Sequence, residues 1–275
     1  MISAEARQPA VAGRFYPGDP VRLGDDVARL LGDTRKEPGR EAYALMAPHA
    51  GYVYSGAVAG ATYARVRVPS QAVVLCPNHT GRGVRRSLWS SGQWNMPGGV
   101  VPIAGELARA IHDAADLDDD HAAHLGEHAI EVQLPFLQAC RPDVTIVPIC
   151  LAGLSLRECH ELGEGLARAI AASPGGARGT LIVASSDMSH YLPADVAKRL
   201  DSLALERVSA LDPDGLYDVV TRHDISMCGF IPTTVALVAA LRLGATGAEL
   251  VRYANSGDVS GDYQSVVGYA GVVVY

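Results

Sequence analysis

Short apolar runs alternate with longer amphipathic stretches along most of the chain. The apolar runs are bounded by turn residues and are short enough to be buried strands. Strands are predicted at 43–47, 72–76, 144–150, 180–184, 250–254 and 265–275. Helices are predicted at 55–66, 105–115, 127–139, 156–172, 194–211, 213–221 and 232–243. Pro135 is expected to kink or shorten the helix that contains it.

This alternation predicts an α/β fold. Continuous apolar strands separated by helices are buried on both faces, so we expect a mainly parallel central sheet covered by helices on both sides. No internal repeat or long linker interrupts the pattern, and the loop Ser173–Gly176 is no longer than an ordinary connection. We therefore expect a single domain over residues 1–275.

The composition is that of a folded soluble protein. Of the 275 residues, 48% are hydrophobic and 19% are charged, which excludes disorder as the main state. The most apolar stretch, residues 266–275, has half of the roughly 20 residues that a membrane-spanning helix needs. The first residues contain no basic segment followed by an apolar run, so we expect no secretory signal.

Charge and cysteine content narrow the range of functions. The net charge is −7 and the basic residues are scattered, so a broad nucleic-acid-binding surface is not expected. The five cysteines form no Cys-x-x-Cys pair and are odd in number. Without an export signal, they are predicted to be reduced thiols of a cytoplasmic protein. The sequence also lacks a phosphate-binding glycine loop and the Gly-x-Ser-x-Gly elbow of serine hydrolases.

Histidines follow three of the predicted strands. His49 follows the first strand, His79 follows the second, and His190 follows the strand that starts at Thr180. Because functional groups gather beyond the carboxyl ends of parallel strands, we expect these side chains at one edge of the sheet. Together they predict a metal site or an acid–base site. The alternative is that each imidazole only satisfies nearby loop backbone.

Cys228 precedes a predicted helix whose expected first residue is Pro232. A helix N-terminus favours the thiolate, which is the form that binds metals or attacks an electrophile. The alternative is a small buried hydrophobic residue, the usual role of a free cysteine. Cys76, Cys140 and Cys150 lie in apolar surroundings and are expected in that second role.

The segment 121–133 contains three histidines and two glutamates. If it is helical, Glu127 and Glu131 lie on one face with His128 beside them. The His-Glu-x-x-His order of zinc proteases is absent. We expect either that the segment supports the ligands of a metal site from behind, or that it is a solvated helix start with favourably placed acids.

Six motifs occur in one order along the chain: MAPHAGYVYSG, CPNHTG, GEHAIEVQLPF, SSDMSHY, MCGFIP and NSGDVSGDYQSVVGYAG. Through them the sequence, from about Ala10 to Tyr275, resembles the Memo family (mediator of ErbB2-driven cell motility). The prokaryotic relatives of that family are named protein B of the AmmeMemoRadiSam system. The resemblance implies a fold similar to the catalytic subunit of class III extradiol dioxygenases, with a non-haem iron site at one edge of the sheet.

The resemblance also implies a set of metal ligands. His49, His79 and Cys228 fall on the metal-site positions of the family. The dioxygenases bind Fe(II) with two histidines and a carboxylate, whereas the third position here is a cysteine. Because a thiolate is a softer ligand that suits copper(I), zinc or iron, the sequence leaves the choice of metal open.

Roles in catalysis and substrate binding are implied in the same way. Asp187 and His190 fall on positions beside the metal, where His190 is expected to transfer a proton and Asp187 to orient it. Tyr54 is expected to line the cleft, and both Tyr54 and His128 are expected to contact the substrate.

The leading hypothesis is therefore a cytoplasmic, metal-dependent redox protein that holds iron or copper, with zinc as a further option. An alternative is a non-catalytic module that binds a peptide or small molecule in the same cleft. A third hypothesis is a hydrolase or lyase with Cys228 as nucleophile and His190 as base. The resemblance implies a radical SAM enzyme and an AMMECR-type protein as partners, whereas nucleic acid and membrane are not expected.

Overall fold

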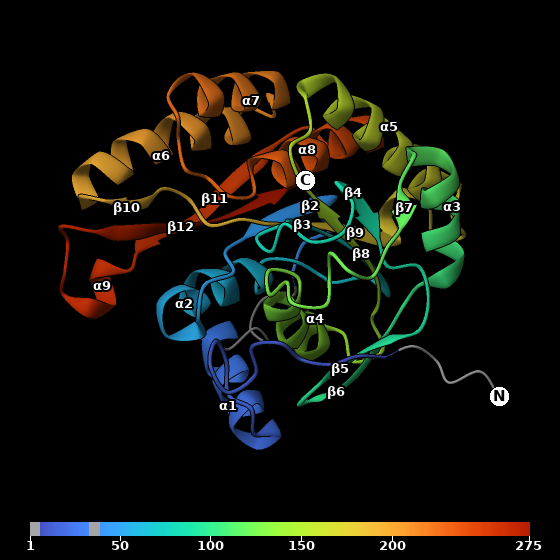
Figure 1. The fold of residues 1–275 in the computed structure, drawn as a ribbon, viewed down its shortest axis with the longest axis horizontal. Coiled ribbons are helices and arrows are strands. Elements are labelled where there is room, and N and C mark those ends of the chain that lie inside the picture. The colour runs from blue at the N-terminus through green and yellow to red at the C-terminus, as the bar shows by residue number, and fades with distance from the viewer. Residues whose placement is uncertain (1–5, 33–38) are drawn as a thin grey trace.

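A central sheet with helices on both faces organises the residues that the computed structural model describes, 6–32 and 39–275 (Figure 1). The expectation about a secretory signal rests partly on residues 1–5, which lie outside these ranges. The strands of the sheet follow the order β10-β12-β2-β9-β3-β8-β4-β7, with β11 paired to β12. Their bounds are β2 (Ala44–Ala47), β3 (Gln71–Pro77), β4 (Arg86–Leu88), β7 (Asp118–Asp119), β8 (Thr145–Leu151), β9 (Thr180–Ser185), β10 (His190–Leu192), β11 (Ala248–Asn255) and β12 (Val266–Val274).

The middle of the sheet is parallel and its margins contain antiparallel pairs. Strands β2, β9, β3 and β8 are parallel neighbours, with Ala47 opposite Ser185 and Cys76 opposite Cys150. Strand β12 pairs antiparallel with β2, β10 and β11, and β4 pairs antiparallel with β8. The predicted α/β fold is confirmed; the four central strands are parallel, and β4 and β7 form one more parallel pair at the margin.

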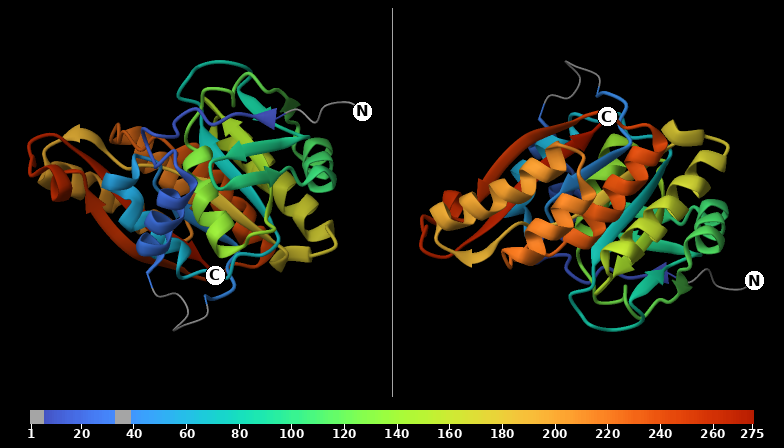
Figure 2. Two further views of the ribbon diagram at one scale, coloured as in Figure 1. Left: turned by 90° about the horizontal axis from the view of Figure 1, so that it is seen from below. Right: turned by 90° about the horizontal axis from the view of Figure 1, so that it is seen from above.

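Helices form one layer on each face of the sheet (Figures 1 and 2). The first layer contains α3 (Gly105–Ala115), α5 (Leu156–Ala172), α6 (Ala194–Ser209), α7 (Pro213–Arg222) and α8 (Phe230–Leu243). The second layer contains α1 (Pro20–Leu31), α2 (Tyr52–Tyr63) and α4 (Leu134–Cys140). A Cβ at Gly60 would lie 2.3 Å from the Leu30 carbonyl oxygen, which explains why small residues dominate α2 where it meets α1. No helix in the described ranges is long and apolar enough to cross a membrane.

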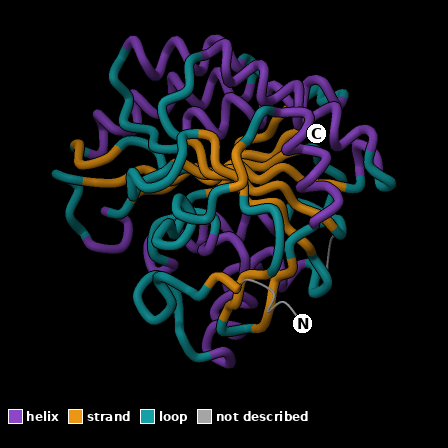
Figure 3. Tube along the Cα trace, turned by 45° about the vertical axis from the view of Figure 1, so that its right-hand side comes forward, coloured by secondary structure: helices purple, strands orange, loops and turns teal. Residues whose placement is uncertain are grey.

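The sheet lies between helices on its two sides (Figure 3), and it separates two hydrophobic cores. Along β3, Val73 and Leu75 belong to the core under α5 and α8, whereas Val74 and Cys76 belong to the core under α2 and α4. Successive strand side chains point to opposite faces, so a strand covered on both sides must be apolar at every position. This explains the continuous apolar runs of the sequence.

The segment before α4 differs from the sequence expectation. A helix was expected from residue 127, but the chain forms turns, then the short 3-10 helix η1 (Glu131–Gln133), and α4 begins only at Leu134. The Glu127 carboxylate accepts the backbone N–H groups of His128 and Ala129, which competes with a helical turn there. Pro135 lies in the first turn of α4, where its missing N–H costs no hydrogen bond, so it does not kink the helix.

Other elements were not expected from the sequence. The amphipathic helix α1 is one, and the strands between His79 and α3 are another group. A separate small sheet has the order β1-β5-β6 and contains β1 (Ala6–Arg7), β5 (Gln93–Met96) and β6 (Gly99–Pro102). The short elements η2 (Gly176–Arg178) and α9 (Gly257–Ser260) complete the fold. Helix α8 begins at Phe230. From the sequence, its first residue is expected to be Pro232.

Candidate metal centre

Histidines from two strand ends meet at one edge of the sheet. His49 follows β2 and His79 follows β3, and these strands flank β9. The centroids of the two rings are 5.1 Å apart, with the edge of one ring toward the face of the other. The convergence expected from the strand-end pattern is therefore found for these two side chains.

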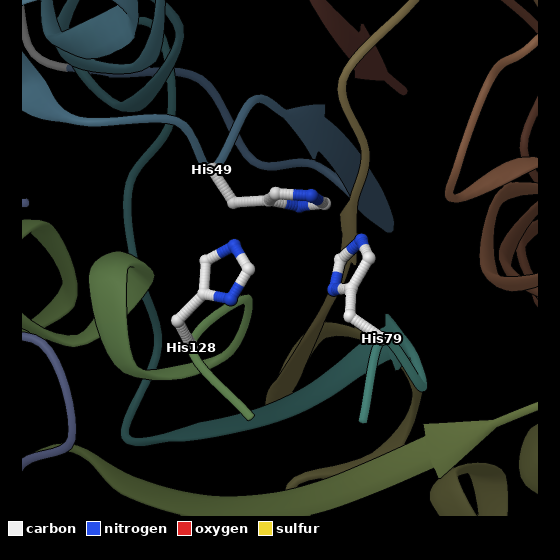
Figure 4. Close-up of side chains that lie close together, drawn as sticks. All are labelled: His49, His79 and His128. Carbon is white, nitrogen blue, oxygen red and sulfur yellow. The ribbon is translucent and has the colours of Figure 1, made fainter. Parts of the chain in front are cut away.

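The third ring of the cluster belongs to His128. Ligand nitrogens of His49, His79 and His128 all lie within 4.8 Å of one another, and Figure 4 shows the three rings around a common space. His128 stacks on His79 with 4.9 Å between ring centroids and 22° between ring planes. The rings of His128 and His49 are arranged edge to face, with 5.4 Å between their centroids. The sequence marked His128 as a substrate contact and did not place it in the converging group.

A serine hydroxyl determines which nitrogen of His49 carries the proton. The Ser185 Oγ donates to the Ala129 carbonyl oxygen at 2.6 Å and accepts the Gln133 Nε2–H at 2.9 Å. It also lies 2.9 Å from His49 Nδ1. Because the single hydroxyl proton is already donated, His49 Nδ1 must be the donor in this contact. The lone pair of the ring is then on Nε2, on the side of the cluster.

A glutamate performs the same task for His79. The Glu127 Oε1 lies 2.9 Å from His79 Nδ1, and Oε2 accepts the His79 backbone N–H at 2.6 Å. A carboxylate accepts only, so Nδ1 donates and the lone pair of His79 is on Nε2. Glu127 also accepts the backbone N–H of His128 at 2.8 Å. This agrees with the expectation that the 121–133 segment supports a metal site from behind its ligands.

The protonation of the cluster follows from burial and from Glu127. Burial, and then the nearby His128 and His79, lower the pKa of His49 far below its ordinary value. Burial also lowers the pKa of His128, although Glu127 opposes the shift. Burial alone would lower the pKa of His79, but the hydrogen bond and charge of Glu127 outweigh it and the pKa is raised. His49 and His128 are therefore neutral imidazoles near pH 7, the form that binds metal ions.

Glu131 anchors the N-terminal segment to the loop that carries Glu127 and His128. Its carboxylate accepts from Arg7 Nη1 at 2.7 Å, from the Tyr16 hydroxyl at 2.7 Å, and from two backbone N–H groups. Arg7 in turn donates to the Glu127 carbonyl oxygen at 2.6 Å. The solvated alternative for this segment is wrong, because Glu127 and Glu131 are 1% and 0% exposed.

Cys228 lies against His49. Its Sγ is 3.2 Å from His49 Nε2, and the backbone N–H of Asp187 points to the same sulfur at 3.2 Å. The next residue, Gly229, makes this approach possible. A Cβ there would lie 2.4 Å from the Ser185 carbonyl oxygen, so a larger residue would push the loop away from β9.

The thiolate expected from the position of Cys228 before α8 is not the favoured form of the ion-free protein. Burial and the nearby negative charge of Asp187 raise the pKa of the Cys228 thiol, although the Asp187 N–H opposes the shift. The neutral thiol can donate its proton to the Nε2 lone pair of His49. A cation placed between these two atoms would replace that proton, so the donor set fits a metal ion.

Asp187 and His190 have different partners from those expected. The Asp187 carboxylate accepts the backbone N–H of His49 at 2.8 Å, and burial raises its pKa to about 6. His190 Nδ1 lies 2.8 Å from the Ser226 carbonyl oxygen, which can only accept. Asp187 therefore holds the loop of His49, and the Ser226 carbonyl oxygen orients the imidazole of His190 through Nδ1. Reasoning from the sequence missed Ser226, although it lies beside the Cys228 motif.

Tyr54 is an exposed aromatic residue close in sequence to His49. It is in the first turn of α2, directly after the loop of His49, and 41% of it is exposed. It is near Tyr269, whose pKa is raised by burial and then by the charges of Asp187, Tyr54 and Tyr191. This position allows Tyr54 to meet a molecule that enters from solvent.

Comparisons with known proteins agree with the motifs. A family described as "Memo-like protein" matches residues 7–273. A MEMO1 family protein of Methanopyrus kandleri is 42% identical over 97% of this chain and 98% of its own length. A MEMO1 family protein of Aquifex aeolicus is 41% identical, with the same two shares covered. One of Methanothermobacter thermautotrophicus is 39% identical over 96% of this chain and 98% of its own length.

Proposed function

The chain belongs to the Memo-like protein family, and we propose that it is a redox-active metalloprotein whose ion is held by His49, His79 and Cys228. The observation that carries the proposal is the distance of 3.2 Å between Cys228 Sγ and His49 Nε2. Metal–nitrogen bonds of about 2.0 Å and metal–sulfur bonds of about 2.3 Å let two such atoms share one tetrahedral ion. The Nε2 lone pair of His79 faces the same cluster.

His128 is assigned to the substrate side of the ion. Its ring is stacked on His79, and its ligand nitrogen lies within 4.8 Å of those of His49 and His79, so it faces the same space as they do. Cys228 is preferred as the third ligand because its sulfur contacts His49 Nε2 directly. His128 is 22% exposed at its side chain and His79 is 34% exposed, so this side of the cluster is open to solvent.

The redox role requires iron or copper. Two imidazoles and a thiolate suit iron, copper and zinc, and of these iron or copper would supply one-electron chemistry if bound. His190 is the proton carrier in this proposal, because its Nδ1 is held by the Ser226 carbonyl oxygen, which leaves Nε2 as the nitrogen that can exchange a proton. The carboxylate of Glu127 keeps His79 in the ligating tautomer.

Metal content after anaerobic purification tests the proposal. We expect the wild type to retain about one iron or copper per chain, and Cys228→Ala to bind it at least about tenfold more weakly. His128→Ala is expected to retain the ion, as is Cys140→Ala, which removes a thiol outside the cluster. Loss of the ion in His128→Ala but not in Cys228→Ala would contradict the proposal and show that the third ligand is His128. Retention of zinc alone would disprove the redox role.

A second candidate function is a binding module without turnover. The exposed side chains of Tyr54 and Tyr191, 41% and 77% exposed, favour it because both lie near Tyr269 at the edge of the site. Exposed aromatic side chains are common anchors for peptides and small molecules. A ligand that binds equally well to wild type and to metal-free Cys228→Ala would support the module over the metalloenzyme.

A further inference from the structure

The opposite edge of the parallel sheet gathers arginines. Arg67 precedes β3, Arg141 precedes β8, and Arg178 in η2 precedes β9, so all three lie where the chain enters a central strand. They line one cavity of about 290 Å³, together with Glu41, which precedes β2. Basic residues that are scattered in the sequence are therefore brought together by the parallel strand order.

Backbone and ring contacts hold this pocket in place. The Arg67 backbone N–H donates to the Arg40 carbonyl oxygen at 2.9 Å, and Arg40 donates to the Arg65 carbonyl oxygen at 2.9 Å. These bonds fix Glu41 beside Arg67. The guanidinium carbon of Arg178 lies 3.8 Å from the centre of the Tyr43 ring. Stacking uses the face of the guanidinium and leaves its N–H edge available for an acceptor.

One carboxylate of the protein itself, that of Glu41, already pairs with the arginines of this pocket. The Glu41 carboxylate pairs with Arg67 and lies 4.0 Å from Arg178. Arg141 pairs with Asp143 outside the set of lining residues, at 2.6 Å. Three arginines therefore line the pocket beside one lining carboxylate, and two of them, Arg67 and Arg178, lie within 4.0 Å of that carboxylate. Glu41 is 52% exposed at its side chain, so it can leave the position when a more highly charged acceptor enters.

We propose that this pocket binds a small, multiply charged oxyanion, either a phosphate-bearing molecule or a polycarboxylate. Arginine forks match the oxygens of both groups, and several guanidinium groups at one point favour ligands with more than one negative charge. The volume of about 290 Å³ is at the lower end of ligand pockets, which suits a small anion. The pocket is separate from the metal centre, because the two lie at opposite ends of the same strands.

Calorimetric titration with inorganic pyrophosphate and with citrate, at low ionic strength, tests this inference. We expect saturable binding of one of them to the wild type, and the tighter one identifies the ligand class. Arg67→Ala and Arg178→Ala should each weaken it about tenfold, as expected for the loss of a charge-assisted contact. Glu41→Gln should tighten binding several-fold, because the internal competitor loses its charge.

The exposed ion pair of Arg242 and Glu164 is the matched control. Arg242→Ala and Glu164→Gln change the net charge by the same amounts and should leave binding within about twofold of wild type. Absence of saturable binding to the wild type, equal losses in Arg67→Ala and Arg242→Ala, or no tightening in Glu41→Gln would each overturn the proposal. Unchanged circular dichroism and thermal midpoints confirm that the variants are folded.

Discussion

The imidazole of His49 lies 2.9 Å from the hydroxyl of Ser185, through Nδ1 and Oγ. The hydroxyl proton is donated to the Ala129 carbonyl oxygen, so the serine can only accept from the ring. A residue outside the proposed ligand set thus determines that Nε2 of His49 is the nitrogen that faces Cys228.

Ser185→Ala should weaken metal binding by about 10- to 100-fold, the usual loss when a group that orients a ligating histidine is removed. The ring of His49 is then free to adopt the other tautomer, which nitrogen NMR of the ion-free protein detects. Thr234→Val is the control, because it removes a buried hydroxyl that bonds within α8. Equal metal affinity in Ser185→Ala and wild type would show that the tautomer of His49 is determined elsewhere.

Glu127→Gln should lower both the pKa of His79 and the affinity for the metal. The raised pKa of His79 depends on the hydrogen bond and charge of Glu127, and the amide keeps at most the first of these. Proton NMR titration of ion-free protein measures the pKa, and a competition assay measures the affinity. Glu161→Gln, at an exposed ion pair with Arg157, should change neither. A pKa of His79 that stays raised in Glu127→Gln contradicts this assignment.

Asp187→Asn should weaken metal binding, because the carboxylate accepts the backbone N–H of His49 and of the next residue, Ala50. An amide offers one acceptor oxygen and turns an N–H toward one of these donors. We expect a loss of about tenfold, in a competition assay with a chelator. Asp113→Asn, at a side chain that is 82% exposed, is the control. Full metal binding with reduced turnover would restore the expected role of Asp187 as the partner of His190.

Glu131→Gln should destabilise the fold by roughly 3 kcal/mol, because it leaves the buried Arg7 guanidinium without its counter-charge. Urea unfolding at pH 7 measures the free energy of unfolding of the ion-free protein. The same change in an exposed pair, Glu164→Gln, should cost less than about 1 kcal/mol. Similar losses in the two variants would mean that the pair of Arg7 and Glu131 contributes no more than a surface ion pair.

His124 should make the fold less stable in acid. Burial, and then the charge of Arg7, lower the pKa of His124 to about 3, whereas the unfolded chain takes up the proton near pH 6.5. Stability from the neutral ring is therefore complete above pH 6.5 and is lost as pH falls toward 3. His124→Phe keeps an aromatic ring between Trp89 and Trp94 and removes the titration.

Urea unfolding of both proteins at pH 7 and pH 5 measures this effect. The wild type should lose about 2 kcal/mol more than His124→Phe over that interval, since each pH unit is worth about 1.4 kcal/mol for one proton. Groups shared by the two proteins cancel in the difference. Parallel losses of stability would mean that His124 titrates normally in the folded protein.

The sequence by itself determined the architecture and two histidines of the candidate metal centre. Strands that are apolar at every position must be covered on both faces, so the runs that contain Val73 and Ile182 already require two helix layers. The carboxyl ends of parallel strands share one edge of the sheet, so the positions of His49 and His79 after two such strands are enough to predict that they meet. Family motifs added Cys228, and the contact with His49 agrees with that placement.

The tertiary structure alone decided how the site is completed. Residues 127–133 have a helical spacing of acids, but the carboxylates of Glu127 and Glu131 take backbone and side-chain donors from other segments, and the helix starts later. Local spacing cannot reveal this, because donors far away in the chain, such as His79 and Ala10, hold the two carboxylates in place. Held there, Glu127 accepts the backbone N–H groups of His128 and Ala129, which a helix would otherwise use. The same holds for His190, whose Nδ1 contacts the Ser226 carbonyl oxygen and not the Asp187 carboxylate that is expected from the sequence. Spacing determines which face a side chain can use, whereas its hydrogen-bond partner depends on which other loops end at the same edge of the sheet.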